Sequence, residues 1–373
     1  MNRHIDYYLF FVVAALVIYG ALFLSTLSAT VSLRTFGTTN YYLFHQLITI
    51  AIGAVLGFIA FKIPLHIVKK FVPILLGINL LLLFSVFLPF FGSKYWGAHR
   101  WLNFGKFVIQ PSEFLKITAI LYFSAWISSK FSESQQKNWI AGMKKGYYNL
   151  IYILLPFALF LAIITVALYL QKDISTLGVI TISLLIVYFS AKTPLWHTLS
   201  IIVAGIGAFL LFIKLEPYRL NRLQVFLHPE TDPMGIGYQV KQSLIAVGSG
   251  GFFGKGWGLS SQKFGFLPQA MTDSFFAVLG EETGILGCSV LILLFLAFLW
   301  LGIKIAKNSK ERFAKLTAIG IVSWITVQAF VNISSSIGIF PLGGIPLPFF
   351  SYGGSHIIAE LASMGILLNI SKS

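Results

Sequence analysis

The sequence predicts an all-α integral membrane protein, and two features of its composition lead to that class. Of 373 residues, 57% are hydrophobic and only 10% are charged, whereas soluble domains carry roughly 25% charged residues. Apolar runs of the length that a helix needs to cross a bilayer recur along the whole chain. Together these observations exclude a soluble globular fold.

Ten apolar runs predict ten transmembrane helices within a single polytopic membrane domain, residues 1–373. The predicted spans are Tyr7–Leu27, Phe44–Phe61, Val72–Phe91, Ser112–Ile127, Tyr148–Tyr169, Ile174–Phe189, Leu195–Ile213, Ser274–Ile303, Leu316–Ile337 and Phe349–Ile370. The first run follows Arg3 as the core of a signal peptide would, but nine further spans favour a retained signal anchor.

The charge balance predicts the orientation of these spans. Lys and Arg number 27 against 12 Asp and Glu, a net charge of +15 that would suggest a nucleic-acid partner in a soluble protein. With the N-terminus inside, the inner segments hold fifteen basic residues and the short outer loops only five. The positive-inside rule therefore predicts cytoplasmic termini, and the basic excess indicates topology, with no nucleic-acid partner.

One connection, residues 214–273, is far longer than the others and separates spans seven and eight. Structureless loops above about 15 residues are usually functional or disordered, yet this one is rich in aromatic residues and has nine glycines between 235 and 265. We expect an extracytoplasmic loop that packs on the outer membrane face through tight turns.

Ionisable residues in or beside membrane spans are costly, so each is a functional candidate. Six carboxylates qualify: Glu113, Asp173, Asp273, Glu281, Glu282 and Glu360. Asp273 is the strongest, because the long loop delivers it to the start of span eight with Lys255 and Lys263 nearby. A half-buried carboxylate there could have a raised pKa and act as a general base, although an Asp would also cap the helix.

For the other candidate carboxylates, a structural role is an alternative to a functional one. Glu113 and Lys116 lie three residues apart on one helix face, which predicts an ion pair or a contribution to a site with Arg100. Asp173 precedes span six, where capping is an equally good reading. Glu281 and Glu282 follow Asp273 by eight and nine residues, and we expect hydrogen-bond partners rather than reactive groups.

Several signatures are absent from the sequence. There is no His-Glu-x-x-His, no Cys/His cluster, no Gly-x-Ser-x-Gly and no Walker loop, so the sequence predicts no metal site, hydrolase nucleophile or ATP-driven pump. The lone Cys288 cannot form a disulfide within the chain. Pro341, Pro346 and Pro348 interrupt the chain near the last span, where irregular backbone is typical of a polar cavity.

Motifs spread over nearly the whole chain resemble those of the SEDS family (shape, elongation, division and sporulation). They are Gly97-Ala98-x-Arg100-Trp101, Gln110-Pro111-Ser112-Glu113-x-x-Lys116, Asp232-Pro233-x-Gly235-x-Gly237-Tyr238, Gly254-Lys255-Gly256, Phe266-Leu267-Pro268, Thr272-Asp273, Gly280-Glu281-Glu282-x-Gly284 and Pro346-Leu347-Pro348-x-x-Ser351-Tyr352-Gly353-Gly354-Ser355. The stretch Gly258-Leu259-Ser260-Ser261-Gln262-Lys263 and the C-terminal residues 365–371 look more like the division type, FtsW, than the elongation type, RodA.

The resemblance implies a ten-span enzyme of the bacterial cytoplasmic membrane that polymerises lipid II into glycan strands on the outer face. Its implied partners are a class B penicillin-binding protein that crosslinks the strands and other membrane proteins of the divisome. By resemblance, Asp273 matches the family's catalytic aspartate, while Arg100, Glu113 and Lys116 match polar cavity positions. No cofactor is implied with certainty, and a divalent cation, Mg²⁺ or Mn²⁺, that helps the pyrophosphate leave is one option.

The implied chemistry assigns roles to the candidates. Asp273 would take the proton of the attacking sugar hydroxyl in a single inverting displacement, since no second positioned carboxylate is evident for a covalent intermediate. Substrate-binding candidates are Arg100, Glu113, Lys116, Arg222 and Lys255, and cavity-lining or structural candidates are Asp173, Glu281, Glu282 and Ser351.

The chain departs from the family pattern before Asp273, where Gln269, Ala270 and Met271 replace the usual Glu-x-His. His356 replaces the second Ser after Ser-Tyr-Gly-Gly. Three alternatives stay open: a lipid II flippase, because many spans and an interrupted last helix suit a transporter, a RodA-type polymerase, and a non-catalytic scaffold for division partners.

Overall fold

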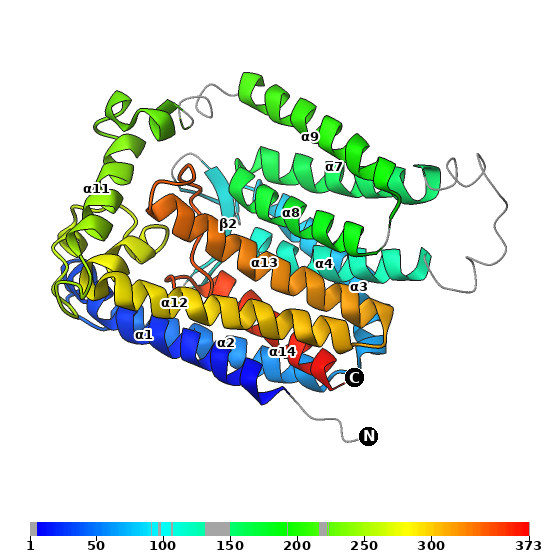
Figure 1. Cartoon of the computed structure of the whole chain (residues 1–373), viewed down its shortest axis with the longest axis horizontal. Helices are drawn as coiled ribbons and strands as arrows, with labels where there is room; N and C mark the ends of the chain where they lie inside the picture. Colours follow the sequence, from blue (N-terminus) through cyan, green and yellow to red (C-terminus); the bar gives the residue numbers. More distant parts are fainter. Residues whose placement is uncertain are drawn as a thin grey trace.

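The computed structural model describes residues 6–90, 92–95, 98–105, 107–130, 150–191, 193–215, 222 and 224–372. It is a mostly helical bundle with one small sheet (Figure 1). Its long helices are α1 Tyr7–Phe36, α2 Tyr41–Lys62, α3 Leu65–Ser85, α4 Pro111–Lys130, α7 Leu155–Leu170, α8 Ile174–Ser190, α9 Leu195–Leu215, α11 Ile236–Ser249, α12 Phe275–Asn308, α13 Arg312–Ser336 and α14 Gly354–Ser371. A helix lies on each of the ten predicted apolar runs.

Six helical segments of the described residues are long and apolar enough to cross a membrane. They are α1, α2, α3, α12, α13 and Leu150–Leu170, which joins the π-helical turn Leu150–Leu154 to α7. The shorter α8 is also apolar. These segments identify a membrane protein.

Several predicted spans have shifted boundaries, and α1 continues past Leu27 to Phe36. Residues 65–71 belong to α3, which follows Pro64 and ends at Ser85, so the span predicted to reach Phe91 ends earlier. The last helix, α14, begins at Gly354, and residues 349–353 belong to an irregular loop, residues 337–353, which we call the proline loop.

The all-α prediction is wrong between α3 and α4. There, β1 Gly92–Tyr95, β2 Ala98–Phe104 and β3 Phe107–Ile109 form an antiparallel sheet in the order β1-β2-β3, with Leu102 opposite both Gly92 and Ile109. Gly105 has a φ of 71°, which a hairpin turn accepts most readily from glycine. The sheet places Arg100 on a strand rather than on a solvated loop.

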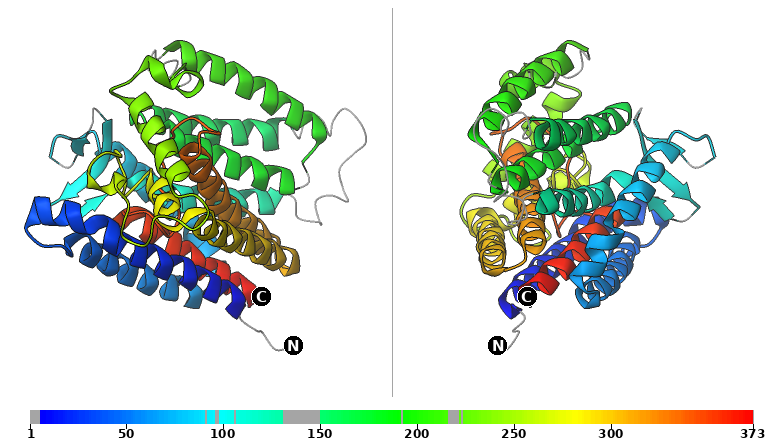
Figure 2. Two further views of the ribbon diagram at one scale, coloured as in Figure 1. Left: turned by 60° about the vertical axis from the view of Figure 1, so that its left-hand side comes forward. Right: turned by 90° about the vertical axis from the view of Figure 1, so that its right-hand side faces the viewer.

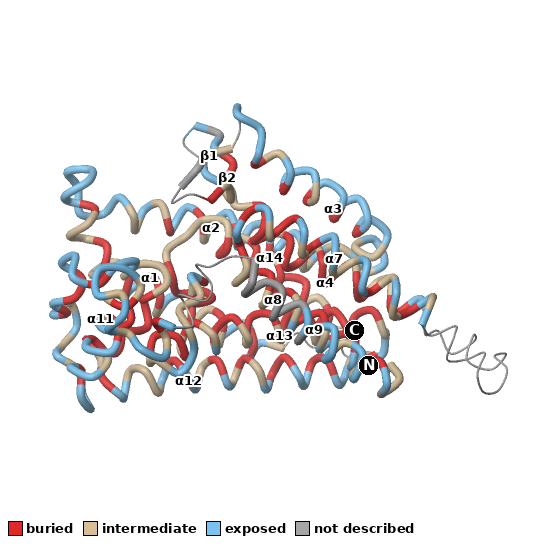
Figure 3. Tube along the Cα trace, turned by 90° about the horizontal axis from the view of Figure 1, so that it is seen from above, coloured by how far each residue is buried: buried red, intermediate tan, exposed pale blue. Residues whose placement is uncertain are grey.

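Buried residues gather along α4, α13 and α14, while α2 and α3 expose most of their apolar side chains (Figure 3). The pair α2 and α14 packs closely in both views of Figure 2. A Cβ on Gly365 would stand 1.9 Å from the carbonyl oxygen of Gly57, so glycines permit this approach. Small residues at helix contacts are typical of packing within membranes.

The helix α12 is broken at Gly284, whose φ of 63° and ψ of −161° are not helical. The usual bonds from Ile285 and Leu286 to the carbonyls of Glu281 and Glu282 are replaced by bonds to the preceding loop. The amides of Lys255 and Gly256 donate to those carbonyls at 2.9 and 3.1 Å, and Ile285 and Leu286 donate to Gly251 and Phe252 at 3.0 and 3.3 Å. The predicted span Ser274–Ile303 is therefore two helical segments clasped by the long connection.

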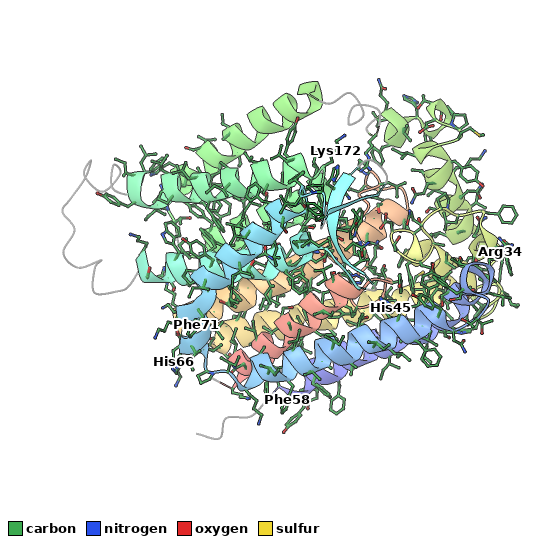
Figure 4. All side chains as sticks on the ribbon, turned by 180° about the vertical axis from the view of Figure 1, so that it is seen from behind. Arg34, His45, Phe58, His66, Phe71 and Lys172 are labelled. Atoms are coloured by element: carbon green, nitrogen blue, oxygen red, sulfur yellow. The ribbon has the colours of Figure 1, made fainter. Side chains whose placement is uncertain are left out.

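The bundle has two distinct ends. The amide of Asp6 donates to Ser371 Oγ at 3.3 Å, so the start of α1 and the end of α14 lie at one end. The helix α11 and the loop that follows it lie at the other (Figure 1). Figure 4 shows Arg34 towards the α11 end and His66 at the opposite end.

Candidate functional site

Asp273 lies immediately before α12, half-buried against the proline loop. A Cβ on Gly344 would stand 3.5 Å from Asp273 Oδ2, so the carboxylate faces the backbone of this loop. Burial raises the pKa of Asp273 to about 6, against the opposing effects of Arg222, Arg100 and the Thr272 hydroxyl. A carboxylate with this pKa is a base for a proton near neutral pH.

Hydrogen bonds fix the backbone around Asp273 to the proline loop. The Asn332 amide donates to the carbonyls of Asp273 at 3.0 Å and Ile345 at 2.8 Å. Ser351 Oγ donates to the carbonyl of Thr272 at 2.6 Å, and the amide of Tyr352 donates to Met271 at 2.8 Å. The segment ending at Asp273 and the proline loop are therefore joined both directly and through Asn332.

The two arginines whose charges act on Asp273 come from distant parts of the sequence. Arg222 Nη1 donates to the carbonyl of Leu342 in the proline loop at 3.3 Å. Arg100, on β2, donates Nε to the carbonyl of Gln171 at 3.3 Å and Nη2 to Lys172. The sheet and the long connection thus each supply one guanidinium group whose charge lowers the pKa of Asp273.

Asp173 occupies the turn on which Arg100 is docked. Its Oδ1 accepts the Thr176 amide at 3.4 Å, the N-cap bond of α8, and its Oδ2 accepts the hydroxyl of Ser112 at 3.0 Å. Gln110 Nε2 adds a bond to Oδ2 at 3.4 Å. Asp173 therefore joins the start of α4 to the start of α8.

Glu113 and Lys116 form a buried ion pair on α4, with 2.7 Å between Lys116 Nζ and Glu113 Oε2. Lys116 Nζ also donates to Gln328 Oε1 at 2.8 Å, and its ammonium lies 5.2 Å from the Trp324 ring centroid. Gln328 Nε2 donates to the carbonyl of Pro346 at 3.0 Å. The pair is thus linked to the proline loop through Gln328.

Lys255, Glu281 and Glu282 form a separate cluster beside the α12 break. Lys255 pairs with Glu281 at 2.7 Å, and Lys263 pairs with Glu282 at 3.4 Å. Glu282 also accepts the amides of Gly258 and Ser260, at 2.8 and 3.2 Å. These side chains hold the glycine-rich loop to α12, and the charges acting on Asp273 are those of the arginines.

Uncharged polar residues that shape this site were not predicted from the sequence. Asn332 and Gln328 are buried on α13, and Gln46 on α2 donates to the carbonyl of Ser351 at 3.3 Å. An amide inside an apolar helix is itself a costly residue, and this signal could have identified all three. Among the described residues, no three His, Cys, Asp or Glu side chains gather as metal ligands.

Comparison with known families places the chain. The family model FtsW/RodA/SpoVE, described as cell cycle protein, matches residues 6–373. The chain belongs to this family. FtsW/RodA/SpoVE proteins are the SEDS proteins that the motifs resemble, so that resemblance is confirmed.

Individual members of the FtsW/RodA/SpoVE family align over nearly the full chain. Stage V sporulation protein E of Bacillus subtilis is 34% identical, covering 98% of this chain and 97% of the relative. The probable peptidoglycan glycosyltransferases FtsW of Trichlorobacter lovleyi and Borreliella burgdorferi are 35% and 38% identical. They cover 98% and 97% of this chain, and 93% and 95% of their own lengths.

Solved structures share the fold. A chain from a peptidoglycan synthase complex that coordinates polymerization and crosslinking superposes with a TM-score of 0.76 at 24% identity, covering 98% of this chain and 97% of that one. The rod shape determining protein RodA of Thermus thermophilus gives 0.69 at 25% identity, covering 98% and 96%.

Proposed function

We propose that this protein is a peptidoglycan glycosyltransferase that polymerises lipid II, with Asp273 as the general base. Family membership and relatives named as peptidoglycan glycosyltransferases support the reaction. The observation that carries the role of Asp273 is its half-buried carboxylate, whose pKa is raised to about 6 beside two arginines.

The reaction needs a proton acceptor and a site for a departing anion. A sugar hydroxyl of one lipid II attacks the anomeric carbon of a second chain, and the new C–O bond forms as the bond to undecaprenyl pyrophosphate breaks. Asp273 takes the hydroxyl proton, which makes the oxygen a better nucleophile. The pyrophosphate leaves with its bonding electron pair, so developing negative charge must be balanced nearby.

Arg222 and Arg100 are the cations that we assign to the pyrophosphate. Arg222 binds the proline loop that Asp273 faces, and the charges of both arginines lower the pKa of Asp273. A guanidinium group can donate two parallel hydrogen bonds to the oxygens of one phosphate, and this bidentate binding suits a pyrophosphate. Lys116 and Glu113 are buried and paired with each other, and Lys255 is paired with Glu281, so we assign none of the three a direct contact with the pyrophosphate.

We further propose the cellular setting. The even number of predicted spans and the shared end of α1 and α14 support termini on one side of the bacterial cytoplasmic membrane, and the excess of Lys and Arg on that side supports the cytoplasmic face. The 214–273 connection then faces outward, where lipid II is polymerised and a class B penicillin-binding protein crosslinks the product. Division-type motifs support a role with other divisome membrane proteins rather than in elongation.

The test is strand synthesis from fluorescent lipid II by the purified chain with its class B partner, with and without Mg²⁺ or Mn²⁺. Asp273→Asn keeps the side-chain shape and should abolish polymerisation while copurification with the partner persists. Glu230→Gln, an exposed acid of the same connection, should leave strand synthesis unchanged. Polymerisation by Asp273→Asn would contradict the role of Asp273, and lipid II transfer across liposomes without polymerisation would favour the flippase.

A further inference from the structure

We infer that Glu360 is a positioning residue for the reaction at Asp273: its carboxylate holds the proline loop in the conformation that seats Asp273. The inference rests on the proposed function and extends it to a residue on α14. Glu360 belongs to no motif of the family resemblance, and the mechanism above does not use it.

Glu360 is fully buried in an apolar helix, with an exposed fraction of 0%. Its Oε2 accepts the backbone amide of Phe349 at 2.8 Å, while its Oε1 has no hydrogen-bond partner. Among the described residues no cation lies within ion-pair distance of it. Such a carboxyl is expensive in a membrane bundle, and the hydrogen bond of its side chain goes to the proline loop.

That contact falls on the most constrained residue of the loop. Phe349 has a φ of 64°, a region that bulky side chains adopt only when their surroundings impose it. Its ring is buried, so the residue cannot relax by turning outward. The hydrogen bond from the Phe349 amide to Glu360 stabilises this backbone conformation directly.

From Phe349 the constraint passes to Asp273 within a few residues. The Phe350 and Ser351 amides close a turn on the carbonyl of Leu347 at 3.2 and 3.0 Å. The Ser351 hydroxyl accepts the Leu347 amide at 2.8 Å and donates to the carbonyl of Thr272 at 2.6 Å. A turn that opened at Phe349 would therefore release Thr272, the residue before the base.

Glu360 also joins the loop to the buried ion pair. Its helix, α14, packs against α4, which carries the Lys116–Glu113 pair. Gln328, bound to Lys116, holds the carbonyl of Pro346, and Glu360 holds the amide of Phe349. Gln328 and Glu360 thus hold the proline loop at two points, and the loop in turn binds the segment that ends at Asp273.

The decisive comparison is between Glu360→Leu, which removes the acceptor, and Glu360→Gln, which keeps one. In the lipid II assay with the class B partner, Glu360→Leu should lower kcat about 10- to 100-fold with little change in KM, because the base is misplaced rather than the substrate lost. Glu360→Gln should stay within about threefold of wild type. Leu367→Ala, a cavity in the same helix, controls for general loss of stability.

A second measurement does not depend on activity. Hydrogen exchange followed by mass spectrometry should show faster exchange in peptides covering residues 347–352 of Glu360→Leu, with α13 peptides unchanged and Glu360→Gln like wild type. If Glu360→Leu does not insert, Glu360→Asp, one methylene shorter, should show the same pattern more weakly.

The outcomes separate the two hypotheses. Wild-type kcat and exchange in Glu360→Leu, or equal losses in the Leu and Gln variants, would overturn the role of Glu360. If Leu367→Ala lost as much kcat as Glu360→Leu, the effect would be one of general stability, and the role of Glu360 would be overturned as well. A wild-type protein that makes no strands would overturn the proposed function, and exchange would still decide whether Glu360 holds the loop.

Discussion

The side-chain amide of Asn332 donates a hydrogen bond to the backbone carbonyl of Asp273 at 3.0 Å. The same amide bonds to Ile345 at 2.8 Å, so one buried side chain of α13 holds both Asp273 and the proline loop. The carboxylate is therefore placed by its backbone, which leaves the side-chain oxygens available for a proton.

Asn332→Leu should lose both bonds and reduce strand synthesis by about 10- to 100-fold in kcat, because small misplacements of a reacting group are costly. This reduction in kcat can be measured as strand synthesis by the purified protein. Asn332→Asp can still accept but cannot donate to the carbonyls, so it should also be defective. Wild-type activity in either variant would show that the carbonyl contacts do not position Asp273.

The pH dependence of strand synthesis should reveal the raised pKa of Asp273. A base must be unprotonated, so kcat/KM should fall about tenfold per pH unit below a pH of about 6. Burial raises this pKa and the positive charge of Arg222 lowers it, so Arg222→Gln should move the acid limb to higher pH. Lys255→Gln, whose partner is Glu281, should leave the limb in place. An unshifted limb in Arg222→Gln would contradict the predicted coupling.

The buried pair of Glu113 and Lys116 predicts an asymmetric stability response. Lys116→Met leaves Glu113 unpaired inside the bundle and should destabilise the fold by about 3–5 kcal/mol. The double variant Glu113→Gln with Lys116→Met removes both charges and should be closer to wild type. Thermal unfolding in detergent, measured over this double-mutant cycle, checks the coupling, and additive losses would count against it.

Two glycines of the long connection provide a matched test of the clasp at the α12 break. Gly254 has a φ of 82°, and a Cβ there would stand 2.2 Å from the carbonyl oxygen of Glu282. Gly254→Ala should therefore lower stability by more than about 2 kcal/mol. Gly248 lies in α11 with nothing near the added Cβ, and Gly248→Ala should be neutral or stabilise by up to about 1 kcal/mol. Equal melting temperatures for both variants would contradict the tight packing.

The sequence predicted the helices well because membrane spans leave a strong signal in apolar run length. It missed the sheet at residues 92–109 because these strands are short and lie between spans, where helix and strand patterns are equally weak. It also missed the break at Gly284, since a lone glycine within a helical pattern does not fix a bend and Glu281 and Glu282 were interpreted as hydrogen-bond partners on one continuous helix.

The site was predictable only in part. Ionisable residues in apolar surroundings identified Asp273, and the i,i+3 spacing predicted the ion pair of Glu113 with Lys116. The approach of Arg222 and Arg100 to Asp273 depends on tertiary packing between segments more than 100 residues apart in some cases, which spacing along one chain does not encode. Asn332 was not predicted because the candidates were selected by charge, and its amide side chain is uncharged.

The clasp between the long connection and α12 restricts how substrates can enter. Four backbone bonds join residues 251–256 to residues 281–286 across the break. Peeling this segment away would break all four bonds and leave the backbone groups at the α12 break without protein partners. It therefore cannot swing aside as a gate during each catalytic cycle, and the growing glycan and its lipid must pass along a route that leaves residues 251–256 in place.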